Sequence, residues 1–192
     1  SEDQIATTLA DVGAQLKSQF DRDRAGVSLR TLSSIKERTQ ALDVFARIIQ
    51  QPEFPKDIVT REKTRIIASI KESSTKPDYI GDRELMKMLY GQHPYGLNEA
   101  GEIETLSRLQ REDLIAFYRS HYVAKNAIIA MIGDVTRQEA AAIAERLTEK
   151  LPAKEAETMI PAVSIPQAGI KRISHPAAQS HIQLAYPGLR RN

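Results

Sequence analysis

The sequence predicts an α+β fold, a two-layer module in which helices pack on an antiparallel sheet. Two segments of alternating polar and apolar residues, 14–20 and 26–32, flank the charged turn Asp21-Arg22-Asp23-Arg24, which is typical of a hairpin. Three amphipathic segments follow in succession, at residues 36–50, 55–73 and 78–89. Helices that follow a hairpin without intervening strands favour α+β over an alternating parallel sheet.

The remaining elements follow from periodicity. Residues 2–12 repeat apolar side chains at helical spacing, and Gly13 suits a left-handed helix end. The polar, turn-rich residues 90–96 predict a loop. Further along, the pattern predicts a helix over 106–122, a buried strand over 127–132, a helix over 136–147 capped by Thr136, and strands over 170–174 and 179–186.

The domain organisation follows from proline spacing. Residues 152–167 contain Pro152, Pro161 and Pro166, which discourage a continuous element and predict a linker. We therefore expect residues 1–151 to form most of a first module and residues 168–192 to supply the first strands of a second. The short helix ahead of the hairpin has no strand of its own beside it, and the chain stops just after a strand. We expect a module truncated at both ends.

Composition excludes several classes of function. The 192 residues carry 27 Lys and Arg against 25 Asp and Glu, so charge does not favour nucleic acid as a partner. The absence of Cys excludes disulfides, thiolate zinc sites, iron–sulfur clusters and a Cys nucleophile. No apolar segment approaches the roughly 20 residues that span a bilayer. The serine-elbow and glycine-rich nucleotide motifs are also missing.

The four histidines do not form a helical metal pair. No two of them stand three or four residues apart on a predicted helix, as a paired imidazole face requires. We expect His93 and His121 to be capping or packing residues. Pro176 separates His175 from His181, which favours a structural or solvated role for both. The residues alone therefore assign no catalytic residue and no metal ligand.

Several strings, in order along the chain, resemble a known family: ADVGAQL, DRDRAGVSLRTLS, ALDVFARIIQQPEF, VTREKTRIIASIKES, LYGQHPYG and REDLIAFYRSHYVAKNAIIAMIGDV. They are similar to the pitrilysin/insulinase family of zinc metallopeptidases with an inverted H-x-x-E-H motif, which includes the mitochondrial processing peptidase and the cytochrome bc core proteins. The resemblance implies a two-layer α+β module, used at least twice, that encloses peptides in a chamber. It also places the upstream strand and the zinc helix before Ser1.

Two positions depart from the pattern of active members. The family carries two glutamates seven residues apart on one helix face; Glu62 matches the first, but Ser69 occupies the expected ligand position. Glu72, about 300 degrees further around the helix, would be a strained substitute. The family's substrate-binding strand, of the type G-x-x-x-N-A-x-T, here reads GAQLKSQF. The resemblance implies substrate contacts along this edge strand, at Ala14, Leu16, Lys17 and Ser18.

The resemblance and its departures together imply a non-catalytic, bacterial-type subunit or half that forms part of a peptide-binding chamber. Its partners would be a peptide substrate or a homologous catalytic subunit, in a homo- or hetero-oligomer, with no cofactor of its own. Zinc would be present only if an upstream motif exists in the full-length protein. The alternatives are a fragment of an active zinc endopeptidase and a structural core-type subunit. The residues encoded before Ser1 would discriminate them, and the bacterial periplasm and the cytoplasm are both plausible locations.

Overall fold

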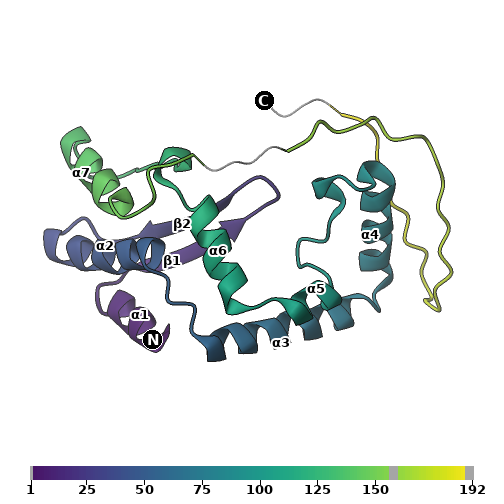
Figure 1. Ribbon diagram of the computed structural model, residues 1–192, viewed down its shortest axis with the longest axis horizontal. Helices are drawn as coiled ribbons and strands as arrows, with labels where there is room; N and C mark the ends of the chain where they lie inside the picture. Colours follow the sequence, from purple (N-terminus) through teal and green to yellow (C-terminus); the bar gives the residue numbers. More distant parts are fainter. Residues whose placement is uncertain (1, 156–159, 189–192) are drawn as a thin grey trace. The chain divides into compact units, whose positions relative to one another are not determined.

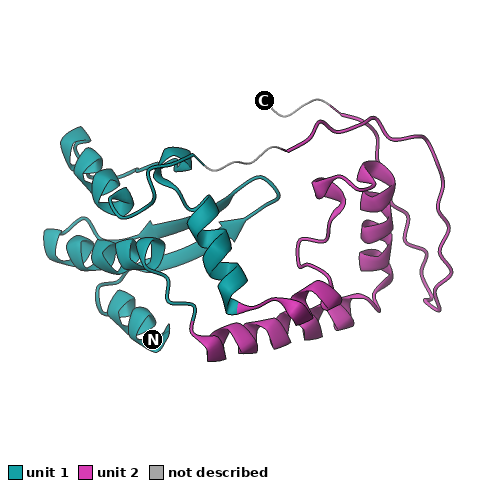
Figure 2. Ribbon diagram, in the orientation of Figure 1, with its two compact units in different colours: residues 1–54, 111–157 teal, residues 55–110, 158–192 magenta. Residues whose placement is uncertain are grey.

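The computed structural model describes residues 2–155 and 160–188, which form two compact units (Figures 1 and 2). The first unit comprises residues 1–54 and 111–157, and the second comprises residues 55–110 and 158–192. Each unit is therefore built from two separate stretches of the sequence.

The first unit contains the predicted hairpin. Strand β1 (Gln15–Phe20) pairs antiparallel with β2 (Ala25–Arg30). The turn between them is closed by the Asp21 N–H, which donates to the Arg24 carbonyl at 2.9 Å. The Asp21 carboxylate accepts hydrogen bonds from the N–H groups of Asp23 and Arg24, so the charged tetrapeptide specifies the turn.

Two helices cover one face of this hairpin. Helix α1 (Glu2–Asp11) precedes β1, and Gly13 between them has φ of 63°, as expected for a helix end. Helix α2 (Ile35–Gln50) packs against α1. The core contains apolar side chains from both helices and from the chain around β1 and β2: Leu9, Val12, Ala14 and Ala41, with Leu16, Leu29 and Val44 packed beside them. This arrangement confirms the α+β class, but of the three helices predicted after the hairpin only α2 packs here; the segments predicted over 55–73 and 78–89 belong to the second unit.

The second stretch of the first unit packs against the first stretch. It contains α6 (Arg111–His121), the short η2 (Ala124–Asn126) and α7 (Arg137–Thr148), which packs on α2. Thr136 caps α7 as predicted, and the Thr136 and Glu139 side chains form a reciprocal capping box. Gln50, a buried polar residue at the end of α2, donates to the Arg146 carbonyl at 2.6 Å and accepts from the Lys150 N–H at 3.2 Å.

The second unit consists of helices followed by an extended segment. It contains α3 (Lys56–Ser73), α4 (Pro77–Tyr90), η1 (Pro94–Gly96) and α5 (Ile103–Arg108). The Lys63 ammonium joins α3 to the end of α5 by donating to the Ser107 and Leu109 carbonyls, at 3.0 and 2.9 Å. Residues 160–188 form no helix or strand, and within them the Gln183 amide donates to the Asp82 carboxylate of α4 at 2.7 Å (Figure 1). None of the described helices is long and apolar enough to cross a membrane.

The single helix predicted over residues 106–122 forms as two separate helices. The sequence pattern over 106–122 continues smoothly, but the chain forms α5 and α6 with a break at Leu109, whose ψ is 130°. The break separates the two units, since α5 belongs to the second and α6 to the first. Apolar spacing alone could not reveal it, because both helices keep the same 3.6-residue period.

Three predicted strands do not form in the part of the chain that the structure describes. Residues 127–132, 170–174 and 179–186 all lack strand pairing. The Ile128 side chain is 96% exposed and Ile132 is fully exposed, so the buried strand predicted at 127–132 is wrong for this structure. A strand requires a partner strand whose backbone completes the hydrogen-bond ladder. An apolar pattern identifies a segment suited to a strand but does not identify its partner. Residues 156–159 of the predicted linker and 189–192 of the predicted second module lie outside the described residues.

Candidate functional site

The candidate metal position lies on helix α3. Glu62 and Ser69 are both helical and seven residues apart, so they share a face of α3 to within about 20 degrees. The Glu62 carboxylate accepts from Nε of Arg65 at 2.7 Å and from Nε of Arg61 at 3.2 Å. The hydrogen bond from Arg65 is the main reason that the pKa of the Glu62 carboxyl is lowered. Glu62 is thus an ion-paired carboxylate, and Ser69, about two turns further along the same face, is an exposed, neutral serine.

The histidines do not supply a metal centre near this face. His93 Nδ1 accepts from the Tyr95 N–H at 3.1 Å and caps η1, which confirms the predicted capping role. His121 packs at the end of α6, where its ring stacks on Phe117 with centroids 4.2 Å apart. Within residues 2–155 and 160–188, no group of three or more His, Asp or Glu side chains could hold a metal ion. The described residues therefore do not fit a zinc site.

The backbone of β1 has a defined open edge. In an antiparallel pair, residues that exchange ladder hydrogen bonds alternate with residues whose N–H and C=O point away from the partner. The Asp21 N–H bonds the Arg24 carbonyl, and the register pairs Phe20 with Ala25 and Ser18 with Val27. Counting back from Asp21, the odd-numbered residues of β1 bond to β2. The outward N–H and C=O groups therefore belong to Leu16, Ser18 and Phe20.

The four residues expected to contact substrate differ in burial and in the availability of their backbone groups. Ala14 precedes β1, is buried, and donates its N–H to the Leu9 carbonyl, so its backbone donor is already used. Leu16 packs toward the core. Lys17 stands opposite Ser28 on the other, polar face of the hairpin and is exposed. Ser18 is exposed and presents its backbone at the open edge, where among the described residues no further strand pairs.

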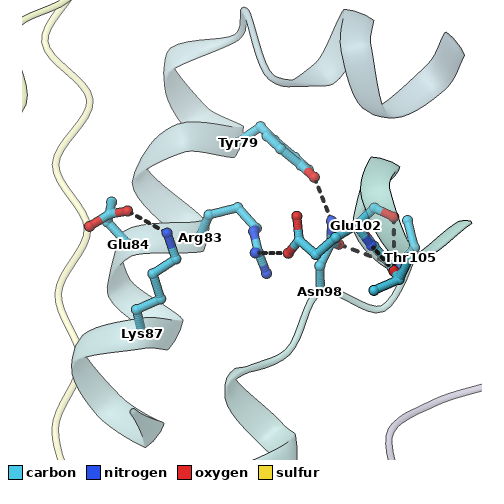
Figure 3. A network of polar contacts seen from close by, with 9 residues as sticks. Tyr79, Arg83, Glu84, Lys87, Asn98, Glu102 and Thr105 are labelled. Carbon is cyan, nitrogen blue, oxygen red and sulfur yellow. Dashed lines mark hydrogen bonds and ion pairs between the residues drawn. The ribbon is translucent and has the colours of Figure 1, made fainter. Parts of the chain in front are cut away.

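A polar network on the second unit was not anticipated from the sequence. Arg83 of α4 forms an ion pair with Glu102, which begins α5, and the Asn98 amide donates to the Tyr79 hydroxyl at 2.9 Å (Figure 3). Thr105 Oγ1 donates to the Glu102 carbonyl at 2.9 Å. A cavity of about 540 Å³ lies beside this network. Because Arg83 pairs with Glu102 and Tyr79 bonds to Asn98, the network holds the 98–105 segment on α4.

Comparison with known proteins places this fold in a family. Residues 1–101 match the family described as "Insulinase (Peptidase family M16)", and residues 108–192 match the one described as "Peptidase M16 inactive domain". The chain belongs to the pitrilysin/insulinase, or M16, family of peptidases. The resemblance in the sequence and the α+β fold class are both confirmed.

Individual relatives agree with this assignment. The chain is 34% identical to the peptidase M16 inactive domain from Pseudomonas fluorescens, a solved structure, with a TM-score of 0.82 over 85% of this chain and 40% of that one. It is 26% identical to a protein named "Uncharacterized zinc protease" from Rickettsia felis, over 96% of this chain and 44% of that protein. It is 27% identical to a probable mitochondrial-processing peptidase subunit beta from Arabidopsis thaliana, over 74% of this chain and 27% of that protein. The chain spans less than half the length of each.

Proposed function

We propose that this chain is part of a non-catalytic half or subunit of an M16-family zinc metallopeptidase and contributes to a chamber that binds peptides. The observation that carries the proposal is Ser69 of α3, which the sequence resemblance assigns to the family's zinc-ligand position. A serine hydroxyl is a poor zinc donor beside a carboxylate. Residues 108–192 match the domain described as inactive, whereas Ser69 lies within residues 1–101, which match the peptidase description.

The contribution to binding would come from the open edge of β1. An extended peptide adds to such an edge through main-chain hydrogen bonds, which supply affinity without requiring particular side chains. The outward N–H and C=O groups of Leu16, Ser18 and Phe20 would pair with the incoming strand. Lys17, on the polar face, would favour an acidic neighbour. A protected edge with Lys17 as a gatekeeping charge is the competing role.

The proposed module boundaries are those predicted from the sequence. Residues 1–151 would form most of one module, 152–167 the linker, and 168–192 the start of the next. Support comes from the spacing of apolar residues in the last segment: Ile182, Leu184 and Tyr186 stand two residues apart along the sequence. This is the period of a strand that presents one apolar face.

The edge proposal is tested by proline substitutions in the full-length protein with its zinc-bearing partner. Ser18→Pro removes an outward donor of β1 and leaves the ladder to β2 intact. Val27→Pro, directly opposite in the register, removes an outward donor from the other edge of the hairpin and is the matched control. We expect only Ser18→Pro to lower assembly with the partner or the partner's peptidase activity. If both variants behave as wild type in both assays, the edge has no role in function.

A second candidate is a part of an active zinc endopeptidase, which the similarity to the zinc protease from Rickettsia felis favours. In that case the full-length protein would carry an H-x-x-E-H motif of its own, and another carboxylate would replace Ser69 as ligand. Metal analysis and a peptide hydrolysis assay on the full-length protein separate the two candidates. About one tightly bound zinc per chain with hydrolysis in the absence of a partner would support the endopeptidase and overturn the non-catalytic assignment.

A further inference from the structure

The Gln183 side chain attaches the last described residues to the first half of α4. Its amide nitrogen donates to the Asp82 carboxylate at 2.7 Å and to the Asp78 carbonyl at 3.3 Å. Both acceptors belong to α4, so each of the two amide hydrogens has a partner. Among residues 171–188, only Gln183 and His175 are half-buried, and the other side chains are exposed. The segment therefore lies beside α4 (Figure 1) without burying its apolar side chains.

Glycine at position 81 makes this approach possible. Gly81 lies in the interior of α4, where glycine is less favourable than alanine. A Cβ at this position would stand 3.2 Å from Oε1, 3.3 Å from Cδ and 3.5 Å from Nε2 of Gln183. Because these three distances are similar, the flat carboxamide group lies across the glycine. The space that a side chain would occupy is therefore taken by the amide of Gln183.

The groups around the Gln183 amide favour a hydrogen-bond donor. Two oxygens of α4 accept from its nitrogen, whereas its own oxygen, Oε1, is buried and accepts no hydrogen bond from the residues that the structure describes. A carboxylate of the same shape would offer no hydrogen to Asp82 and would place a second negative charge beside it. The contact therefore suits a primary amide and rejects the isosteric acid.

We propose that Asp78, Gly81 and Asp82 form a carboxamide-binding site on α4, here called the amide cradle, whose ligand is the side chain of the chain's own Gln183. The cradle holds the end of the described chain on α4 at one position. Gln179 is the other glutamine of this segment, and it is exposed, so the cradle takes one glutamine of the two. Because the cradle lies in the second unit and β1 in the first, this proposal is independent of the proposed peptide-binding edge.

The strength of the attachment is limited by solvent. Asp82 is exposed, so water competes for its carboxylate, and the hydrogen bond raises the docking equilibrium roughly threefold to tenfold. Gly81→Ala should remove this gain, because the added methyl group displaces the amide while alanine itself favours the helix. The effect should be local, since His175 Nε2 lies 3.1 Å from the Thr75 carbonyl and forms a separate attachment earlier in the segment.

The test is NMR spectroscopy of this chain at neutral pH. The wild type should show NOEs from the Gln183 side-chain amide protons to the α-protons of Gly81. Gln183→Ala and Gln183→Glu should both move the backbone amide signals of residues 78–83, because neither variant fills the cradle. Gln179→Glu is the matched control: it adds the same charge four residues earlier and should leave those signals in place. Absence of the wild-type NOEs, or wild-type signals at 78–83 in Gln183→Glu, would overturn the proposal.

Two further measurements identify the site and the source of its ligand. In the Gly81→Ala background, adding Gln183→Ala should no longer move the signals of residues 78–83, because the methyl group has already displaced the amide; signals that still move would refute the role of Gly81. Isotope-filtered NOEs on a mixture of ¹⁵N-labelled and unlabelled chains distinguish the chain's own Gln183 from that of a second copy. NOEs found only between different copies would refute the intramolecular assignment.

Discussion

Gln50 joins α2 to the end of α7, and its replacement by glutamate should produce a pH-dependent loss of stability. Its amide nitrogen donates to the Arg146 carbonyl, one of the last four carbonyls of α7, which lack helical partners. Its amide oxygen accepts from the Lys150 N–H. Gln50→Glu preserves the acceptor and the shape but removes the donor. At neutral pH a carboxylate oxygen would then face a carbonyl oxygen.

The cost can be worked from these contacts. Leaving a buried carbonyl without its donor costs about 1–3 kcal/mol. A carboxylate at the negative end of a helix adds up to about 1 kcal/mol, and Gln50 is only 9% exposed, so solvent screens the charge poorly. We expect Gln50→Glu to lower the free energy of unfolding by about 1–4 kcal/mol at pH 7.5. For a chain of this length that lowers Tm by roughly 2–16 °C.

The sign of the pH dependence follows from the direction of the pKa shift. Burial beside a carbonyl disfavours the charged form, so the new carboxyl should have a higher pKa in the folded chain than in the unfolded chain. Stability is then nearly restored below the unfolded value of about 4.3, where the protonated group can donate to Arg146. It is lost as the pH rises through the folded value.

The assay is thermal or urea unfolding between pH 5.0 and 7.5, with Gln51→Glu as the matched control. Gln51 is the next residue, stands at the same helix end and is exposed, so its replacement should change stability by no more than about 0.5 kcal/mol. Because both variants add one carboxyl at the end of α2, the difference between them isolates the buried contact. Equal stability of the two variants at pH 7.5, or a deficit of Gln50→Glu that does not shrink on acidification, would refute the reasoning.

Two further predictions concern the α7 cap and the α3 face. The pKa of the Glu139 carboxyl is lowered to about 2 by hydrogen bonds from the Thr136 backbone N–H, the Thr136 hydroxyl and the Arg38 guanidinium, in decreasing order of effect. The contribution of Glu139 to stability is therefore present above its ordinary pKa of 4.5 and is lost as the pH falls toward 2. Thr136→Ala should raise that pKa in a carboxyl NMR titration and cost about 0.5–2 kcal/mol through the lost cap; an unchanged titration would contradict this. Ser69→Glu in this chain should still yield no stoichiometric zinc by metal analysis, because it supplies no imidazole ligands.

Structural features that depend on neighbouring residues could be predicted from the sequence. The hairpin, the Gly13 helix end, the Thr136 cap and the His93 cap all depend on contacts within a few positions, and local patterns report them. The capping interaction between Glu102 and Thr105 was missed because the order is reversed relative to the usual Ser/Thr-x-x-Glu signature.

Features set by distant residues were not accessible. The partners of Gln50 lie 96 and 100 positions away, and nothing in the residues around Gln50 predicts them. The same limit explains residues 127–132. Their apolar pattern reports a preference for burial in a sheet, but pairing depends on a neighbouring strand that a one-dimensional pattern does not identify.

The exposed side chains of Ile128 and Ile132 bear on the proposed function, because burying them against a partner would contribute free energy to binding. Burying one fully exposed isoleucine side chain contributes about 1.5–3 kcal/mol, and Ile128 and Ile132 are both essentially fully exposed in the first unit. The same unit contains the outward backbone groups of β1, which would gain hydrogen bonds when a strand is added. Apolar burial and edge pairing are separate sources of affinity, and they can be removed separately. A partner that uses only the edge should be sensitive to Ser18→Pro and indifferent to Ile128→Ser, whereas a partner that completes the sheet should be sensitive to both.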